Sequence, residues 1–351
     1  MTKKAAMTQN ERINALLNRE PVDCVPFVHK GYSFCASNVG IPKADIFEFP
    51  LRSYQAQLWT MEQYNAEQAP FYTFVAYGAW EFGGEIAWPE DRWASGPSVA
   101  RRPVQNIEDV YKLSLPDVKT TGCIPRMMEF ARLQERYGTQ IAFIYGSPFT
   151  FCANLCGVDR FLEWAASDPE VVHHAMRLMC DHLKQVADWF IETFGAERVL
   201  PRVASPTDGL ISPRMYERLI LPYRMELHQY VIDRGVKHIY DHVCGEQNKN
   251  LPLLAKLPWG DPGMLSFGHE VDLLKAAEIF PNEIICGNIE PALVVQGSRE
   301  EVYEASRKNI EIGKQIKSGF VFMGGCDIPA SVPPHNIYLM GKAAEEFGQY
   351  N

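Results

Sequence analysis

Eight short runs rich in β-branched and aromatic residues recur along the chain, separated by stretches with helical spacing of apolar residues. The runs cover residues 25–31, 71–77, 141–147, 199–205, 237–245, 264–268, 284–289 and 320–326. Between them, stretches such as 212–235 and 298–319 repeat apolar residues at intervals of three and four. Strands that alternate with helices form a parallel sheet, and eight such units close a (β/α)8 barrel. The sequence therefore predicts an α/β fold of the TIM-barrel type.

Two segments depart from this alternation. Thr8 and Glu11 have the spacing of a capping box, so we expect a short N-terminal helix over residues 9–18. Residues 82–105 contain a glycine pair, prolines and short alternating runs, which predict a β-hairpin excursion after the second strand. With no linker or repeat in view, we expect residues 1–351 to form one barrel domain.

Composition excludes several classes of protein. The net charge of −9 leaves no basic stripe to neutralise phosphates, so we expect no nucleic-acid partner. The N-terminus has lysines without an apolar run after them, and no run of 18 apolar residues follows anywhere, so we expect a cytoplasmic protein with no membrane partner. In that compartment the nine cysteines are expected to be free thiols or metal ligands.

His242 and Cys244 lie two residues apart at the end of the fifth predicted strand, just before Gly245. Strand side chains alternate, so both point to one face with Cα atoms about 6.5–7 Å apart, within reach of one metal ion. Cys326 ends the eighth predicted strand after two glycines. The carboxyl ends of barrel strands surround one cavity, where active sites lie. The three residues could therefore meet there, although a buried histidine beside a structural cysteine remains an alternative.

Two thiolates and an imidazole are ligands that zinc prefers, and three protein ligands leave the fourth position open, as in catalytic sites. A fourth ligand could come from His269 or Glu270, just past the sixth predicted strand, and be displaced by substrate. The alternative is a loop residue bonded to backbone. The sequence thus predicts a catalytic zinc site, with a purely structural zinc in a binding protein as the competing interpretation.

Several segments also carry a family resemblance that covers nearly the whole chain. They are GSPFT (146–150), HVCG (242–245), CGNIEP (286–291) and GGCDIPASVPPHNI (324–337). With them the chain resembles the uroporphyrinogen decarboxylase superfamily, and its His-x-Cys and later Gly-Cys resemble the zinc-containing, corrinoid-dependent methyltransferases of that superfamily. Segment 80–93 resembles methyltransferases of the O-demethylase type. The resemblance implies a barrel with zinc held by His242, Cys244 and Cys326.

The resemblance to the decarboxylases themselves is weaker. Those enzymes hold the carboxylates of a tetrapyrrole with an arginine-rich signature near the N-terminus. The matching region here, FVHKGYSFCASNVG, has one lysine and no arginine, so the main source of binding energy is missing. The chain also lacks the D-x-H-x-x-G motif of corrinoid proteins. Any cobalamin is therefore expected on a separate corrinoid-binding protein.

Zinc can stabilise a negative charge on oxygen or sulfur, which allows two directions of methyl transfer. We favour transfer from a methyl ether, a methoxylated aromatic, to the cobalt(I) of the partner's corrinoid. The alternative is a methylcobamide:thiol methyltransferase, and less strongly a decarboxylase-like enzyme. The aromatic-dense segment 80–93, with Trp80, Tyr32 and Tyr145 near strand ends, is expected to line a pocket for a flat ring, or else to pack as ordinary core.

Three polar residues at strand ends complete the candidates. Asp208 follows the fourth predicted strand and could bind substrate or accept a proton, or serve as a turn residue before glycine. Asn288 ends the seventh predicted strand and is expected to hydrogen-bond substrate or the zinc shell. Asp241 points to the face opposite His242, so we expect a structural salt bridge there.

Overall fold

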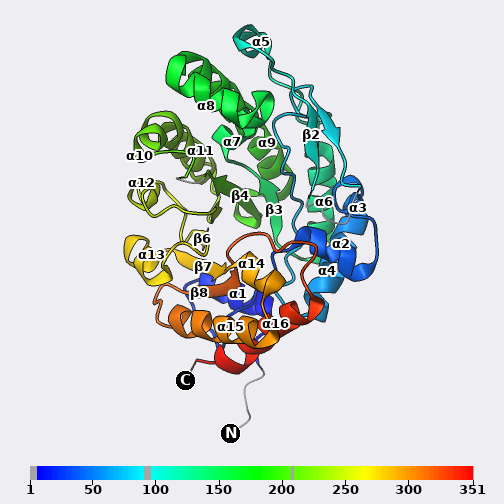
Figure 1. Ribbon diagram of the computed structural model, residues 1–351, viewed down its shortest axis with the longest axis vertical. Coiled ribbons are helices and arrows are strands. Elements are labelled where there is room, and N and C mark those ends of the chain that lie inside the picture. The colour runs from blue at the N-terminus through cyan, green and yellow to red at the C-terminus, as the bar shows by residue number, and fades with distance from the viewer. Residues whose placement is uncertain (1–5, 91–95, 207–208, 351) are drawn as a thin grey trace.

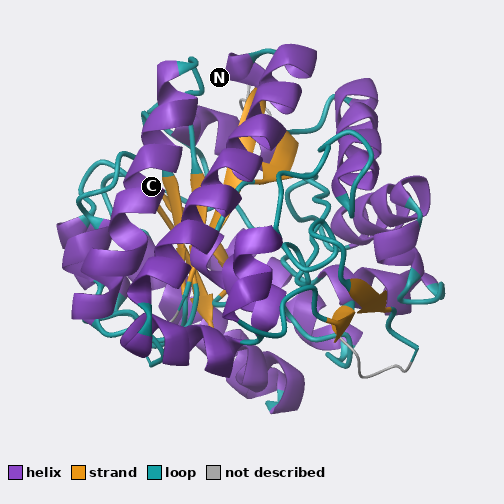
Figure 2. Cartoon of the chain, turned by 90° about the horizontal axis from the view of Figure 1, so that it is seen from above, coloured by secondary structure: helices purple, strands orange, loops and turns teal. Residues whose placement is uncertain are grey.

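The computed structural model describes residues 6–90, 96–206 and 209–350. Six parallel strands form one sheet in the order β3-β4-β5-β6-β7-β8, and β1 and β2 form a separate antiparallel pair. Figure 2 shows the larger sheet in the interior with helices around it, and in Figure 1 both termini lie at the same end of the molecule. The strands are β1 (Glu85–Ala87), β2 (Ser98–Arg101), β3 (Ile141–Ile144), β4 (Val199–Ser205), β5 (Tyr240–Val243), β6 (Met264–Phe267), β7 (Ile284–Ile289) and β8 (Phe320–Gly324).

The helices follow the strands in the alternation that the sequence predicts. They are α1 (Gln9–Leu17), α2 (Tyr32–Val39), α3 (Asp45–Glu48), α4 (Pro50–Gln63), α5 (Ile107–Lys112), α6 (Ile124–Tyr137), α7 (Pro148–Cys156), α8 (Val158–Ser167), α9 (Pro169–Phe194), α10 (Pro213–Met215), α11 (Leu221–Asp233), α12 (Leu251–Leu254), α13 (Leu273–Ile279), α14 (Pro291–Gln296), α15 (Arg299–Gly313) and α16 (Pro334–Phe347), with the 3-10 helix η1 (Ala196–Arg198) and the π-helix η2 (Tyr216–Ile220). Within the described residues, no helix combines the length and the apolar character needed to cross a bilayer.

The first predicted strand closes the barrel without forming a regular strand. The Val28 amide donates to the carbonyl of Phe322 in β8, and the Phe322 amide donates to the carbonyl of Pro26. These two hydrogen bonds form an isolated parallel bridge between Phe27 and Phe322. On its other side, the Phe27 carbonyl accepts from the Glu67 amide. Residues 25–30 therefore lie in the barrel wall beside β8, as predicted, but the expected strand 25–31 is wrong as a continuous ladder.

The prediction of a second strand at residues 71–77 is wrong, because side chains from helices form hydrogen bonds with backbone groups at the start of this segment. The side-chain amide of Gln57 in α4 accepts from the Phe71 amide and donates to the Phe71 carbonyl. Gln134 in α6 donates to the Pro70 carbonyl and accepts from the amide of Ala142 in β3. The Gln134 side chain thus bridges the gap between this segment and β3 where a backbone ladder was expected.

The two predicted departures from the alternation are both present. Thr8 caps α1 and forms a reciprocal capping box with Glu11, as the sequence predicts. The excursion after the second barrel segment contains β1 and β2, which pair antiparallel with Ile86 opposite Val99. Figure 1 shows β2 and α5 far from both termini. The predicted hairpin is therefore confirmed as an antiparallel pair.

Candidate metal centre

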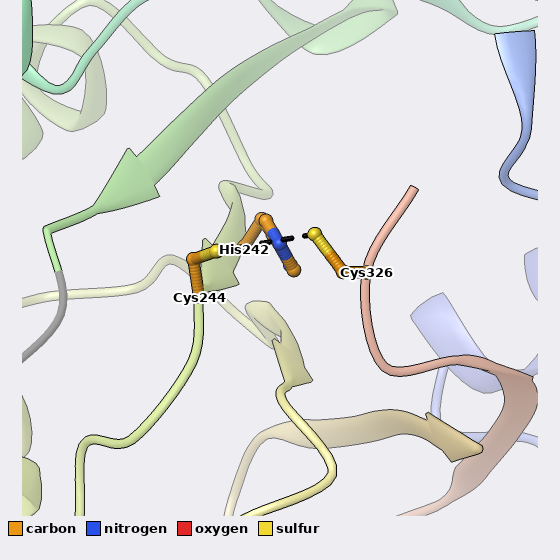
Figure 3. Close-up of side chains that lie close together, drawn as sticks. All are labelled: His242, Cys244 and Cys326. Atoms are coloured by element: carbon orange, nitrogen blue, oxygen red, sulfur yellow. Dashed lines mark hydrogen bonds between the residues drawn. The ribbon is translucent and has the colours of Figure 1, made fainter. Parts of the chain in front are cut away.

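His242, Cys244 and Cys326 converge at the carboxyl ends of β5 and β8. His242 lies in β5, Cys244 directly follows it, and Cys326 lies two residues beyond β8. One ligand atom from each residue lies within 4.8 Å of those of the other two, and the sulfur atoms of Cys244 and Cys326 are 3.9 Å apart. Figure 3 shows the three side chains pointing toward one another. The predicted strands 237–245 and 320–326 each end two residues too late, so both cysteines belong to loops.

Glycines allow these loops to approach. Gly245 takes a positive φ of 64° and turns the chain directly after Cys244. A Cβ on Gly268, after β6, would lie 2.9 Å from the Gly245 backbone nitrogen. A Cβ on Gly325 would lie 2.8 Å from the backbone nitrogen of His269. Three loop backbones therefore meet around the cysteines at distances that larger residues would prevent.

The imidazole of His242 is held at one nitrogen and free at the other. Its Nδ1 lies 3.2 Å from the hydroxyl oxygen of Ser266, which occupies the opposite position on β6. Its Nε2 is buried without a hydrogen-bond partner among the described residues. Burial, followed by the charge of Lys30, lowers the pKa of His242 and favours the neutral ring that metals bind. A second partner on Nδ1 is the usual support of a ligating histidine.

The thiols of Cys244 and Cys326 lie within hydrogen-bonding distance of each other. The contact with Cys244 lowers the pKa of Cys326, and the same contact raises the pKa of Cys244. Two thiolates bound to one tetrahedral zinc at ~2.3 Å would be about 3.8 Å apart, close to the 3.9 Å found here. Donor types, sulfur separation and the free Nε2 of His242 all fit a zinc ion.

His269 and Glu270 lie near this cluster, outside the 4.8 Å group. The Nδ1 of His269 is 3.4 Å from Glu270 and its Nε2 is 3.8 Å from Glu290, so both ring nitrogens face carboxylates. The negative charge of Glu270 is among the causes that raise the pKa of Cys244. Of the two predicted fourth ligands, Glu270 is therefore the one whose charge affects the pKa of a cluster thiol.

Comparison with known proteins gives the family. The uroporphyrinogen decarboxylase (URO-D) family matches residues 8–347. The chain belongs to this family. The methylcobamide:CoM methyltransferase MtbA of Methanosarcina acetivorans is 27% identical over 97% of this chain and 98% of its own length. The uroporphyrinogen decarboxylase of Citrifermentans bemidjiense is 25% identical over 70% of this chain and 71% of its own.

A solved structure described as a methyltransferase from Methanosarcina mazei superposes with a TM-score of 0.79 at 22% identity, covering 97% of this chain and 99% of its own. This likeness supports the barrel fold. The predicted superfamily is thus confirmed. Relatives that match nearly the whole chain include methylcobamide:CoM methyltransferases, at 26–27% identity, and uroporphyrinogen decarboxylases of Xanthomonas, at 22–23% identity.

Asn288 positions a loop of this URO-D barrel. Its side-chain amide donates to the carbonyls of Gly268 and Val271, at 2.9 and 2.7 Å. These bonds hold the loop that carries His269 and Glu270 against β7. Both amide hydrogens are thus used to position the loop, and the hydrogen bond from Asn288 to substrate or to the zinc shell stays a prediction.

The three predicted aromatic residues do not form one pocket. Tyr32 lines an interior cavity. Tyr145 is fully buried, and its hydroxyl donates to the Leu227 carbonyl in α11, outside the barrel. Trp80 stacks on Phe74 in the excursion. The expected ring pocket is therefore corrected to Tyr32 alone, while Asp208 lies outside the described residues.

The polar network behind β5 confirms the predicted role of Asp241. Its carboxylate accepts from Arg224 of α11 at 2.8 Å and from the Ser205 hydroxyl at 2.9 Å. Arg224 and Asp241 are at most 1% exposed. This buried ion pair ties β4, β5 and α11 together on the face opposite His242, so it fixes the strand that carries two of the metal-site residues.

Sequence reasoning missed two cations inside the barrel. Lys30 follows the first barrel segment, and Arg202 lies in β4, two residues before Ala204. Both line the same cavity as Tyr32. Burial lowers the pKa of Lys30, and the neighbouring charge of Cys326 opposes that effect. The signal for Arg202 was available: it is the one charged residue in an otherwise apolar run, VLPRVAS.

Proposed function

We propose that this protein is a zinc-dependent methyltransferase that exchanges a methyl group between a small substrate and the cobalt of a corrinoid carried by a separate protein. The observation that carries the proposal is the convergence of one imidazole and two thiols at the carboxyl face of the barrel. Methyltransferase relatives that match nearly the full length support it.

His242, Cys244 and Cys326 would hold the zinc and leave a position for the substrate. A bound zinc supplies Lewis acidity, which stabilises negative charge on an oxygen or sulfur atom. Ser266 keeps Nδ1 of His242 occupied, so Nε2 is the nitrogen left for the metal. The loop carrying Glu270 lies where a carboxylate could enter and leave as substrate departs and binds.

Two directions of transfer fit this site. In the first, the electron pair of cobalt(I) forms a bond to the methyl carbon of a methyl ether, and the carbon–oxygen bond breaks. The oxygen keeps its electron pair and takes a proton from water. Tyr32 and Tyr240, which line the cavity, support a methoxylated aromatic substrate for this direction.

In the second direction, a thiolate attacks the methyl group of methylcobalt(III), which releases cobalt(I) and a thioether. The two relatives described as methylcobamide:CoM methyltransferases favour this direction. A decarboxylase-like activity has less support. The segment that matches the arginine signature of the uroporphyrinogen decarboxylases contains no arginine here, and Lys30 is its one lysine.

The test uses the full chain, a cobalt(I) corrinoid protein and a panel of methoxyaromatics, followed by visible spectroscopy. Formation of methylcobalt(III) supports the ether direction, and His242→Ala should abolish it. Consumption of methylcobalt(III) on adding a thiol supports the second direction. Absence of both changes, with zinc bound, would refute the methyltransferase proposal.

A further inference from the structure

A buried glutamine joins the backbone of Cys244 to the end of β4. Gln247 lies three residues after Cys244, and its side chain is fully buried. Its Nε2 donates one hydrogen bond to the carbonyl of Pro206, directly after β4, and another to the carbonyl of Cys244, at 3.2 Å. Because a side-chain amide has two N–H groups, these two bonds use its whole donor capacity.

The two carbonyls depend on Gln247 because the backbone ladder stops beside them. The register between β4 and β5 ends at Ser205 and Val243. The next residue after β4 is Pro206, which has no N–H group with which to continue the ladder. A carbonyl that leaves a ladder needs another donor. The Gln247 amide therefore replaces the ladder at the point where β4 and β5 open into the mouth of the barrel.

Asn250 orients the amide of Gln247. Asn250 is also fully buried, and its Nδ2 donates to the Oε1 of Gln247 at 3.4 Å and to the carbonyl of Ile211 at 3.2 Å. The contact at Oε1 turns Nε2 of Gln247 toward the two carbonyls. Pro206 and Ile211 flank the segment that carries Asp208. Both ends of that segment are therefore anchored to the loop after β5.

The turn at Cys244 is also restricted from the side of β6. A Cβ on Gly268, directly after β6, would lie 2.9 Å from both the backbone nitrogen and the backbone oxygen of Gly245. Since β4 and β6 are the two neighbours of β5 in the sheet, the turn is held from both sides. Held in this way, Cys244 places its sulfur 3.9 Å from that of Cys326.

We propose that Gln247 is a positioning residue of the metal site, which ties the Cys244 backbone to the end of β4 so that the Cys244 thiol faces His242 and Cys326. This rests on the proposed function, since it concerns the metal site of that function. Gln247 acts through the backbone of a predicted ligand. Its loss frees Cys244, whereas His242 stays fixed within β5.

The first measurement is the affinity of the full chain for zinc, by competition with a chromophoric chelator. Gln247→Met keeps the length of the side chain and removes both donors. We expect its affinity to fall about tenfold, as is usual when a residue that orients a metal ligand is removed. An affinity equal to that of the wild type would overturn the proposal.

Gln134→Met is the matched control. Gln134 is equally buried, and its amide likewise bridges two backbone segments, at Pro70 and Ala142, but in the barrel wall between helix and strand. This variant should lose stability and keep the zinc affinity of the wild type. If both methionine variants lost zinc affinity to the same extent, the effect of Gln247 would be general destabilisation and the positioning role would be wrong.

Gln247→Asn provides a second variant in case Gln247→Met does not fold. It keeps an amide but is one methylene shorter, so it cannot span the carbonyls of Pro206 and Cys244. We expect weaker zinc binding than in the wild type, together with altered thiolate-to-cobalt absorption when cobalt(II) replaces zinc. Wild-type affinity and an unchanged cobalt spectrum in this variant would also overturn the proposal.

Hydrogen exchange on the metal-free full chain gives a readout that does not depend on a metal. Loss of Gln247 should accelerate exchange of the backbone amides of residues 243–248 and leave those of β8 unchanged, because the opening is local. Unchanged exchange at 243–248, or equal acceleration throughout the chain, would overturn the positioning role. A wild-type chain that binds no zinc would refute the zinc-dependent function, and exchange would still decide the role of Gln247.

Discussion

The sulfur atoms of Cys244 and Cys326 lie 3.9 Å apart, although the two residues are separated by 82 positions in the sequence. The strands that precede them, β5 and β8, are not neighbours in the sheet, because β6 and β7 lie between them. Such residues can meet only over the open end of the closed wall. The candidate metal site therefore depends on the barrel as a whole.

The metal content provides the first prediction. Purified protein should hold about one zinc per chain, because there is one set of three ligands within the described residues. Cys244→Ala and Cys326→Ala should each lose most of it, as measured by atomic absorption, with unchanged far-ultraviolet circular dichroism. Cys156→Ala, a buried cysteine in α7, is the control and should keep its zinc. If the double variant Cys244→Ala/Cys326→Ala kept its full zinc content, this site would be excluded.

The second prediction concerns Ser266, which contacts Nδ1 of His242. Ser266→Ala should lower zinc affinity about tenfold, as is usual when the partner of a ligating histidine is removed. Competition with a chromophoric chelator measures this change. Ser306→Ala removes an equally buried hydroxyl that donates to Val302 in α15 and should leave the affinity unchanged. Equal affinities for both variants would show that Ser266 does not support the ligand.

The third prediction concerns the buried pair of Arg224 and Asp241. Arg224→Met leaves the Asp241 carboxylate buried without its cation, so the free energy of unfolding should fall by about 3–5 kcal/mol. Urea denaturation measures this. Arg234→Met breaks the partly exposed pair with Asp188 and should cost about 1 kcal/mol or less. Similar losses in both variants would contradict the structural role of Arg224.

The fourth prediction concerns the pH dependence of stability. Burial raises the pKa of Glu67 to about 7, and Arg202 opposes this only in part. The Glu67 carboxyl group therefore binds its proton more tightly in the folded state than in the unfolded chain. The stability that this difference provides is lost as the pH rises from about 4.5 through 7. Relative to Glu67→Gln, the wild type should lose about 3 kcal/mol of unfolding free energy between pH 4.5 and 8. If urea denaturation gave the same difference in unfolding free energy between the wild type and Glu67→Gln at every pH, the prediction would be refuted.

The order of strands and helices could be predicted from local patterns. The alternation of β-rich and helical stretches holds for β3 to β8, and the capping box at Thr8 begins α1 as expected. The segment 71–77 could not be assigned correctly. Its composition favours a strand, but Gln57 and Gln134 from two distant helices bind backbone groups at its start. Local sequence carries no information about such partners.

The sequence by itself determined which residues form the candidate metal site. Strand alternation places His242 and Cys244 on one face, and glycines beside Cys244 and Cys326 mark tight loops. It did not determine which neighbouring side chains face inward. In parallel strands both faces are buried, so apolar residues give no alternation from which to read the direction of Tyr145.

Only the tertiary structure decided that Tyr145 points outward to α11 and that Lys30 and Arg202 face one interior cavity. The physical reason is that charge compensation in a protein interior depends on groups from different strands. Lys30 and Arg202 are 172 positions apart, and no local pattern shows that their side chains line one cavity. The barrel wall brings them together, and the same closure brings Cys326 to Cys244.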